Sequence, residues 1–119
     1  MKPRALICED DSALRAVVGD LLVAHGWVTS EALTASDAID MASTLHPDLM
    51  VLDVELAGMS GLESIPRVRA GTPGVRVVAM SGTGWAPDLC LGAGACAVVT
   101  ADDLDRLDQL LTALEVQAA

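Results

Sequence analysis

Residues 6–15 read LICEDDSALR, in which a run of apolar or nearly apolar side chains leads directly into three carboxylates and then into a helical pattern. The apolar run does not alternate with polar residues, which is typical of a strand buried on both faces of a parallel sheet. From Ser12 to about His25, apolar residues recur at helical spacing, and Gly26 follows as a C-terminal cap. A buried strand followed at once by a helix predicts the opening unit of an α/β fold.

The same alternation of apolar runs and helical patterns continues to the end of the chain. The expected strands are residues 4–8, 27–33, 49–54, 75–80 and 96–99, of which 27–33 is the weakest. The expected helices are residues 12–25, 36–45, a segment after Ser60, 86–93, and a last helix that begins between Thr100 and Asp103. Five alternations predict one doubly wound parallel sheet with helices on both faces.

Two of these helices contain residues that disfavour helical structure. Pro66 lies inside the third helix and should kink or shorten it, although Ser60 and Glu63 form a capping-box pair at its start. The fourth helix, residues 86–93, is interrupted by both a proline and a glycine. We therefore expect a short or irregular fourth helix.

Composition and charge limit the classes of function. The 119 residues give room for one domain with one core. A formal net charge of −10 argues against nucleic-acid binding, because affinity for the phosphate backbone comes from Lys and Arg, so the expected ligands are cations or basic surfaces. No apolar run approaches the roughly 20 residues that cross a bilayer, and no signal segment opens the sequence, which predicts a cytoplasmic protein without membrane contact.

The cysteines and histidines do not suggest a metal or nucleophile site of their own. Cys8, Cys90 and Cys96 are an odd set without C-x-x-C spacing, so we expect small buried apolar residues rather than disulfides or zinc ligands. His25 falls at the end of the first helix, where the helix dipole favours it, and His46 falls in a turn. Both histidines are therefore expected to be structural.

Three carboxylates follow two predicted strands at the point where each strand ends. Glu9 and Asp10 end the first strand and Asp53 ends the third, so the three converge on one crevice if these strands are neighbours where the strand order reverses. Like charges this close raise one another's pKa, and such a cluster implies a bound cation; oxygen ligands suit Mg²⁺ or Mn²⁺. The alternative is that acids follow a strand only to cap a helix, as Asp11 or Ser12 is expected to do.

At these segments the chain resembles the receiver domain of bacterial two-component response regulators. The resemblance spans essentially the whole chain and is carried by ICEDDSALR (7–15), HPDLMVLDVELAGMSGLE (46–63), VRVVAMSG (75–82) and, in part only, GAGACAVVTADDL (92–104). It implies a flavodoxin-like five-stranded parallel sheet of order 2-1-3-4-5. It also implies a single receiver domain over residues 1–119, without an output domain.

The resemblance implies a role for each residue of the crevice. Asp53 would accept a phosphoryl group from a partner histidine kinase or phosphotransfer protein. Asp10, Asp53 and the backbone carbonyl of Glu55 would bind Mg²⁺ or Mn²⁺ directly, and Glu9 would hold a metal-bound water. Ser81 would donate a hydrogen bond to a phosphoryl oxygen, with a simple turn residue as the alternative. Such a domain is a phosphoacceptor signalling module that acts on a downstream protein, and not an enzyme with a separate substrate.

Several positions depart from the family pattern. The lysine that normally ends the fifth strand falls on Ala101, so its cation is missing unless Arg15 or Arg106 approaches from a helix. The aromatic switch position falls on Val98; Trp85 could serve instead, although a loop tryptophan that covers the core is the favoured interpretation. A homodimer is expected to use the face formed by the fourth helix, fifth strand and fifth helix.

Two questions stay open from the sequence. The carboxylate of Glu55 points either toward the mouth of the crevice or outward into solvent. The chain is either a phosphorylation-dependent receiver or a pseudo-receiver, which is a phosphorylation-independent interaction module read by its partners in one fixed state. The acids together with Ser81 favour the first interpretation, because a module without metal has little use for clustered carboxylates.

Overall fold

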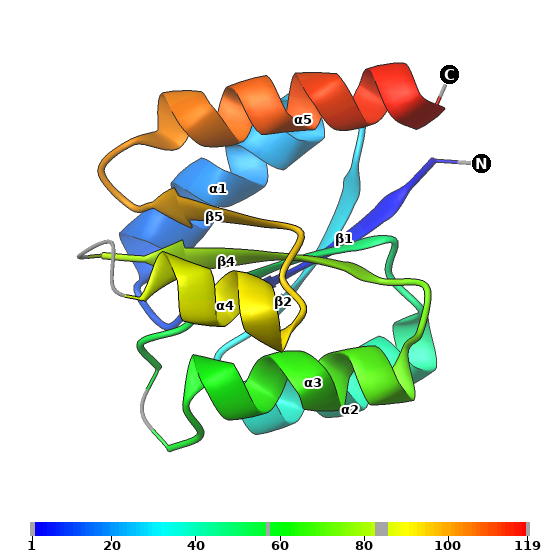
Figure 1. Cartoon of the computed structure of the whole chain (residues 1–119). Coiled ribbons are helices and arrows are strands. Elements are labelled where there is room, and N and C mark those ends of the chain that lie inside the picture. The colour runs from blue at the N-terminus through cyan, green and yellow to red at the C-terminus, as the bar shows by residue number, and fades with distance from the viewer. Residues whose placement is uncertain (1, 57, 83–85, 119) are drawn as a thin grey trace.

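Five strands form one parallel sheet in the order β2-β1-β3-β4-β5 (Figure 1). The computed structural model describes residues 2–56, 58–82 and 86–118, with side chains described up to residue 115. The strands are β1 (Arg4–Cys8), β2 (Val28–Ala32), β3 (Leu49–Asp53), β4 (Arg76–Ser81) and β5 (Ala97–Thr100). Each strand lies within one residue of its expected range, and the order is the one that the family resemblance implies.

Five helices connect the strands and cover both faces of the sheet (Figure 1). They are α1 (Ser12–Ala24), α2 (Ala35–Leu45), α3 (Gly61–Gly71), α4 (Pro87–Ala93) and α5 (Leu104–Ala118). Helices α1 and α5 pack on one face, and α2, α3 and α4 pack on the other. Helix α4 has seven residues, so the expectation of a short fourth helix is confirmed.

Alternate side chains of each central strand enter different apolar cores. In β3, Met50 and Leu52 belong to the core under α2, α3 and α4, whereas Leu49 and Val51 belong to the core under α1 and α5. All four are fully buried. This double burial explains why the strands are uninterrupted apolar runs in the sequence.

Side chains and glycine define the helix ends that border the site. The Asp11 carboxylate accepts a hydrogen bond from the Leu14 N–H (3.0 Å) at the start of α1. At the other end of α1, Gly26 takes a positive φ of 89°, which lets the Trp27 N–H donate to the Leu22 carbonyl (3.0 Å). The expected glycine cap is therefore confirmed, and it turns the chain directly into β2.

The structure corrects the expectation for Cys96 and tests the one for Pro66 in part. Pro66 does not shorten α3, which continues to Gly71 and, like α2, is eleven residues long. Ile65 and Val68 on either side of the proline are buried in the core, and this packing offsets a proline cost of about 3 kcal/mol. Cys96 is exposed rather than buried, because it lies in the turn that precedes β5.

Cys8 and Cys90 are buried, as the sequence predicts, and all three cysteines are free. Burial raises the pKa of the Cys8 thiol to about 12, with the nearby carboxylates adding to the shift. Its thiolate is therefore not populated near neutral pH. Among the helices described, none combines the length and the apolar character that crossing a membrane requires.

Candidate functional site

The carboxyl ends of β1 and β3 lie side by side and place three acids together. The two strands pair in parallel from Ala5 with Leu49 to Cys8 with Leu52. The residues that follow, Glu9 and Asp10 on one strand and Asp53 on the other, therefore emerge at the same edge of the sheet. One carboxylate oxygen from each of the three lies within 4.8 Å of the others.

Glu9 is the buried member of this cluster, with 2% of its surface exposed. Its Oε1 accepts a hydrogen bond from the Asp11 N–H (3.0 Å), but its Oε2 is buried without a hydrogen-bond partner in the described structure. Burial, with a further contribution from the Asp53 carboxyl, raises the pKa of Glu9 to about 8. A buried carboxylate oxygen without a partner needs a proton or a cation, and two further carboxylates nearby favour a cation.

The donor set of the cluster fits Mg²⁺ or Mn²⁺. All three donors are carboxylate oxygens, which hard divalent cations prefer, and only Glu9 is fully buried, which leaves the others open to water. Asp53 is half-buried. Its Oδ1 accepts a hydrogen bond from the Glu55 N–H (2.8 Å), which fixes the carboxylate and leaves Oδ2 directed to other partners.

A close backbone approach shapes the loop after Asp53. The Val54 N–H donates to the Met80 carbonyl (2.9 Å), and the Gly61 N–H donates to the Val54 carbonyl (3.3 Å). A Cβ on Gly61 would lie 2.3 Å from the Val54 Cβ and 2.6 Å from its Cα. Only glycine permits this contact, which brings the start of α3 against the end of β3.

Ser81 and Glu55 meet at the same edge. Ser81 ends β4 and is fully buried. Its hydroxyl donates a hydrogen bond to Oε1 of Glu55. The structure therefore decides between the two orientations left open by the sequence: the Glu55 carboxylate points into the crevice. The sequence signal was the position of Glu55 two residues after Asp53, but nothing local indicated its hydrogen bond with Ser81.

The three clustered acids and Glu55 line a cavity of about 270 Å³. Its lining consists of Glu9, Asp10, Asp11, Leu14, Asp53, Glu55, Met80, Gly82 and Ala101. Ala101 reaches the cavity because its N–H donates to the Ser81 carbonyl (2.9 Å), which continues the pairing of β4 with β5. In the part of the chain that the structure describes, no lysine, arginine or histidine lines this cavity.

The two arginines that could have supplied a cation are held elsewhere. Arg15 forms an ion pair with Glu31 (3.2 Å) and donates from Nη1 to the Glu9 carbonyl (3.1 Å). Arg106 donates to the backbone oxygen of Val98 (3.4 Å). Neither arginine lines the cavity, so the approach from a helix that the sequence left open is not seen.

Two further positions singled out in the sequence are Val98 and Trp85. Val98 is partly buried and packs against the core under α2, α3 and α4. Trp85 lies outside the described residues. Val98 does not line the cavity beside the acidic cluster.

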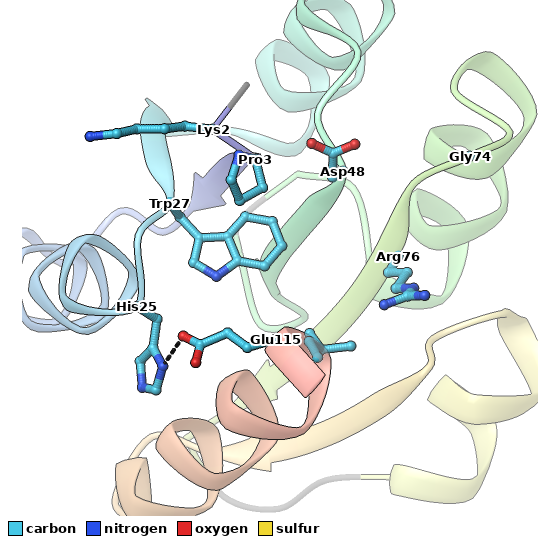
Figure 2. A pocket seen from close by; sticks show the side chains of 9 residues that line it. Lys2, Pro3, His25, Trp27, Asp48, Gly74, Arg76 and Glu115 are labelled. Carbon is cyan, nitrogen blue, oxygen red and sulfur yellow. Dashed lines mark hydrogen bonds and ion pairs between the residues drawn. The ribbon is translucent and has the colours of Figure 1, made fainter. Parts of the chain in front are cut away.

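A larger cavity of about 520 Å³ lies at the opposite edge of the sheet (Figure 2). There His25 contacts Glu115 (2.5 Å) and Asp108 (2.6 Å), and these acids raise its pKa. The structural role expected for His25 thus extends to partners on α5 that lie 83 and 90 residues away in the chain. Local sequence could not show them. Each of these two acids has a partner, unlike the buried Oε2 of Glu9 at the other edge.

Comparison with known proteins identifies the family. The response regulator receiver domain matches residues 5–113. The chain belongs to this receiver family. Among curated relatives, the receiver is 29% identical over 84 residues to sporulation initiation phosphotransferase F of Bacillus subtilis, covering 71% of this chain and 68% of that protein. It is 26% identical over 85 residues to chemotaxis protein CheY of Thermotoga maritima, covering 71% of each.

Solved structures share the receiver fold. The receiver domain of sensor histidine kinase PA1611 from Pseudomonas aeruginosa, which has a magnesium ion coordinated in its active-site cleft, superposes with a TM-score of 0.76 at 20% identity. The match covers 93% of this chain and 98% of that one. A CheY-like receiver domain protein from Methanospirillum hungatei gives a TM-score of 0.79 at 24% identity, covering 98% and 99%. The cluster of Glu9, Asp10 and Asp53 resembles the phosphoacceptor site of this family.

Proposed function

We propose that this receiver domain accepts a phosphoryl group on Asp53 in a reaction that depends on Mg²⁺ or Mn²⁺. The donor is a histidine kinase or a phosphotransfer protein, and the output is a protein contact with a downstream target in the cytoplasm. The observation that carries the proposal is the convergence of Glu9, Asp10 and Asp53 within 4.8 Å beside the buried hydroxyl of Ser81. The domain signals and does not turn over a separate substrate.

The proposed metal ligands are Asp10, Asp53 and the backbone carbonyl of Glu55, with Glu9 holding a metal-bound water. The buried, unpartnered Oε2 of Glu9 supports this assignment, because a cation with its water would satisfy that oxygen. When bound, the divalent cation neutralises the carboxylates and the charge of the incoming phosphoryl group.

The residues of the chain position the transfer. The Glu55 N–H holds Oδ1 of Asp53, so Oδ2 is the oxygen that attacks phosphorus. The new O–P bond forms as the P–N bond of the phosphohistidine breaks, and the electron pair of that bond returns to the imidazole nitrogen. The Ser81 hydroxyl then donates to a phosphoryl oxygen. Transfer of this kind needs positioning and charge compensation more than covalent chemistry.

We further propose that the domain is an atypical receiver. Ala101 lines the cavity at the position of the family's lysine, so the ion pair with the phosphoryl group is missing. A charge-assisted hydrogen bond contributes about 1.5–3 kcal/mol, which corresponds to roughly a tenfold to hundredfold change in an equilibrium constant. Phosphorylation survives such a loss, but the acyl phosphate is less stabilised. Val98 in place of the aromatic switch residue changes the coupling to the face of α4, β5 and α5.

A pseudo-receiver is the second candidate. The observation that favours it is the hydrogen bond between Ser81 and Glu55, together with the lack of a basic side chain around the cavity within the described residues. In that case the acids would fix one conformation for a protein partner, without phosphoryl transfer.

The experiment that separates the two incubates the protein with Mg²⁺ and acetyl phosphate and follows the intact mass. The proposal predicts a gain of one phosphoryl group in the wild type and none in Asp53→Asn. Magnesium binding without a mass gain in the wild type would support the pseudo-receiver.

A further inference from the structure

The side chain of Glu55 uses the hydroxyl group that the proposed function assigns to the phosphoryl group. Ser81 is fully buried and its hydroxyl donates to Oε1 of Glu55. A serine hydroxyl has only one proton to donate. While Glu55 accepts that proton, a phosphoryl oxygen cannot, so the two anions compete for the same donor.

The described side chains around this contact offer no positive charge to the two anions. A cation between them would compensate two negative groups at once, but Ala101 offers only a methyl group, and no basic side chain lines the cavity in the described parts of the chain. The opposite wall is Gly82, where even an added Cβ would lie 3.7 Å from Oε2 of Glu55. Glu55 therefore has room inside the crevice, but no basic side chain among the described lining residues compensates its charge beside a phosphoryl group.

Glu55 can also leave the crevice. The residue as a whole is exposed, since it belongs to the loop between β3 and α3, and its backbone stays in place through the hydrogen bond from its N–H to Asp53. A rotation of the side chain that breaks its contacts inside the crevice would expose the carboxylate to water. The movement thus involves only the Glu55 side chain, and the Glu55 carbonyl, a proposed metal ligand, stays in place.

We propose that the Glu55 carboxylate is an internal occupant of the phosphoryl position, and that phosphoryl transfer to Asp53 requires Glu55 to release Ser81. This inference rests on the proposed function and adds a gate to it. The resting receiver already has its serine engaged by an anion, so phosphorylation exchanges one anion for another instead of filling an empty place.

The test measures the rate of phosphorylation of Asp53 by acetyl phosphate at saturating Mg²⁺, by intact mass. In this reaction the O–P bond to Asp53 forms and the P–O bond to the acetyl group breaks, so acetate leaves with the electron pair. We expect Glu55→Ala to react about fivefold to tenfold faster than the wild type, since a charge-assisted hydrogen bond no longer has to break. Glu55→Gln keeps a weaker acceptor for Ser81 and should lie between them.

A matched control separates the contact from general repulsion of the donor. Asp102→Asn removes one negative charge next to Ala101 from an exposed residue that does not line the cavity, and it should change the rate less than twofold. In a Ser81→Ala background, where the shared donor is gone, we expect the gain from Glu55→Ala to shrink to less than twofold. A gain that is equal in Asp102→Asn, or that persists undiminished without Ser81, would overturn the inference.

A second readout needs neither metal nor phosphodonor. In metal-free protein, Glu55→Ala should shift the backbone and Cβ resonances of Ser81, whereas Asp102→Asn should leave them unchanged. Unshifted Ser81 resonances, or equal rates for wild type and Glu55→Ala, would refute the gate and leave the proposed function standing. If neither protein gains mass while both bind Mg²⁺, the proposed function fails and the gate fails with it.

Discussion

Acidic residues at the two ends of the parallel strands differ in whether they have partners within the chain. The amino edge is the one where the strands begin, and the carboxyl edge is the one where they end. At the amino edge, Glu115 and Asp108 contact His25 at 2.5 and 2.6 Å. At the carboxyl edge, Glu9, Asp10 and Asp53 converge, and Oε2 of Glu9 is buried without a partner within the residues described. The first arrangement is complete within the chain, whereas the second needs something from outside. This difference, and not the size of the cavities, is the reason for placing the proposed functional site at the carboxyl edge.

The largest expected effect concerns the backbone contact that builds the carboxyl edge. Gly61→Ala should lower the free energy of unfolding by about 2 kcal/mol or more, because the added methyl group meets both the side chain and the backbone of Val54. Urea unfolding measures the change. Gly92→Ala in α4 is the control, since nothing lies within 4 Å of its added Cβ, and it should be neutral or slightly stabilising. Equal losses in both variants would show that Gly61 is not a close contact.

Removing one acid from each edge should change stability in opposite directions. Without divalent cations, Glu9→Gln should raise the free energy of unfolding on the order of 1–2 kcal/mol, because it removes a buried carboxylate that lacks a partner. Glu115→Gln should lower it by about 0.5 kcal/mol, since it weakens a partly exposed pair with His25. Urea titrations in EDTA measure both, and a destabilised Glu9→Gln would contradict the comparison.

Addition of Mg²⁺ should sharpen the contrast between these two variants. The wild type and Glu115→Gln should both gain stability with Mg²⁺, whereas Glu9→Gln should gain less, because a ligand stabilises the folded state according to its affinity. Thermal unfolding at increasing Mg²⁺ concentration measures the effect. Equal gains in all three proteins would mean that Glu9 takes no part in binding.

A lysine at position 101 should supply the compensation that the carboxyl edge lacks. We expect Ala101→Lys to lengthen the lifetime of the acyl phosphate, or to strengthen beryllofluoride binding, by about tenfold through one charge-assisted hydrogen bond. Decay of the phosphorylated mass after removal of the donor gives the lifetime. No change in either quantity would show that Ala101 is not the position of the missing cation.

The smallest expected effect is the pH dependence of the amino edge. Because Asp108 and Glu115 raise the pKa of His25 in the folded state, their stabilisation is fully present below a pH of about 6.5 and is lost as pH rises through the raised pKa. The loss should not exceed about 1 kcal/mol, since both acids are about half exposed. Urea titrations give the free energy of unfolding at pH 6 and at pH 9. His25→Gln should remove the part of the difference between these two values that comes from the His25 pairs. An unchanged difference would contradict the pairing.

The sequence was sufficient for whatever depends on local pattern and chain direction. Uninterrupted apolar runs predicted the strands, and the acids at the ends of β1 and β3 had to meet once those strands were neighbours. The length of α3 was less predictable, because the cost of Pro66 is local, while the burial of Ile65 and Val68 that offsets it depends on the packed sheet.

Side-chain contacts between distant segments were beyond the sequence. Glu55 had two equally good orientations until the position of Ser81, 26 residues further along, was known. His25 has acidic partners on α5 that no helical period could indicate. In both cases the missing information was which side chains of different elements face one another.

The most direct test of the account is the position of a divalent cation. Crystals of the protein grown with Mn²⁺ should give an anomalous difference peak within coordination distance of Asp10 and Asp53, and the peak should be absent in Asp53→Asn. A well-ordered structure in which Mn²⁺ binds elsewhere while these carboxylates remain uncoordinated would contradict the central claim.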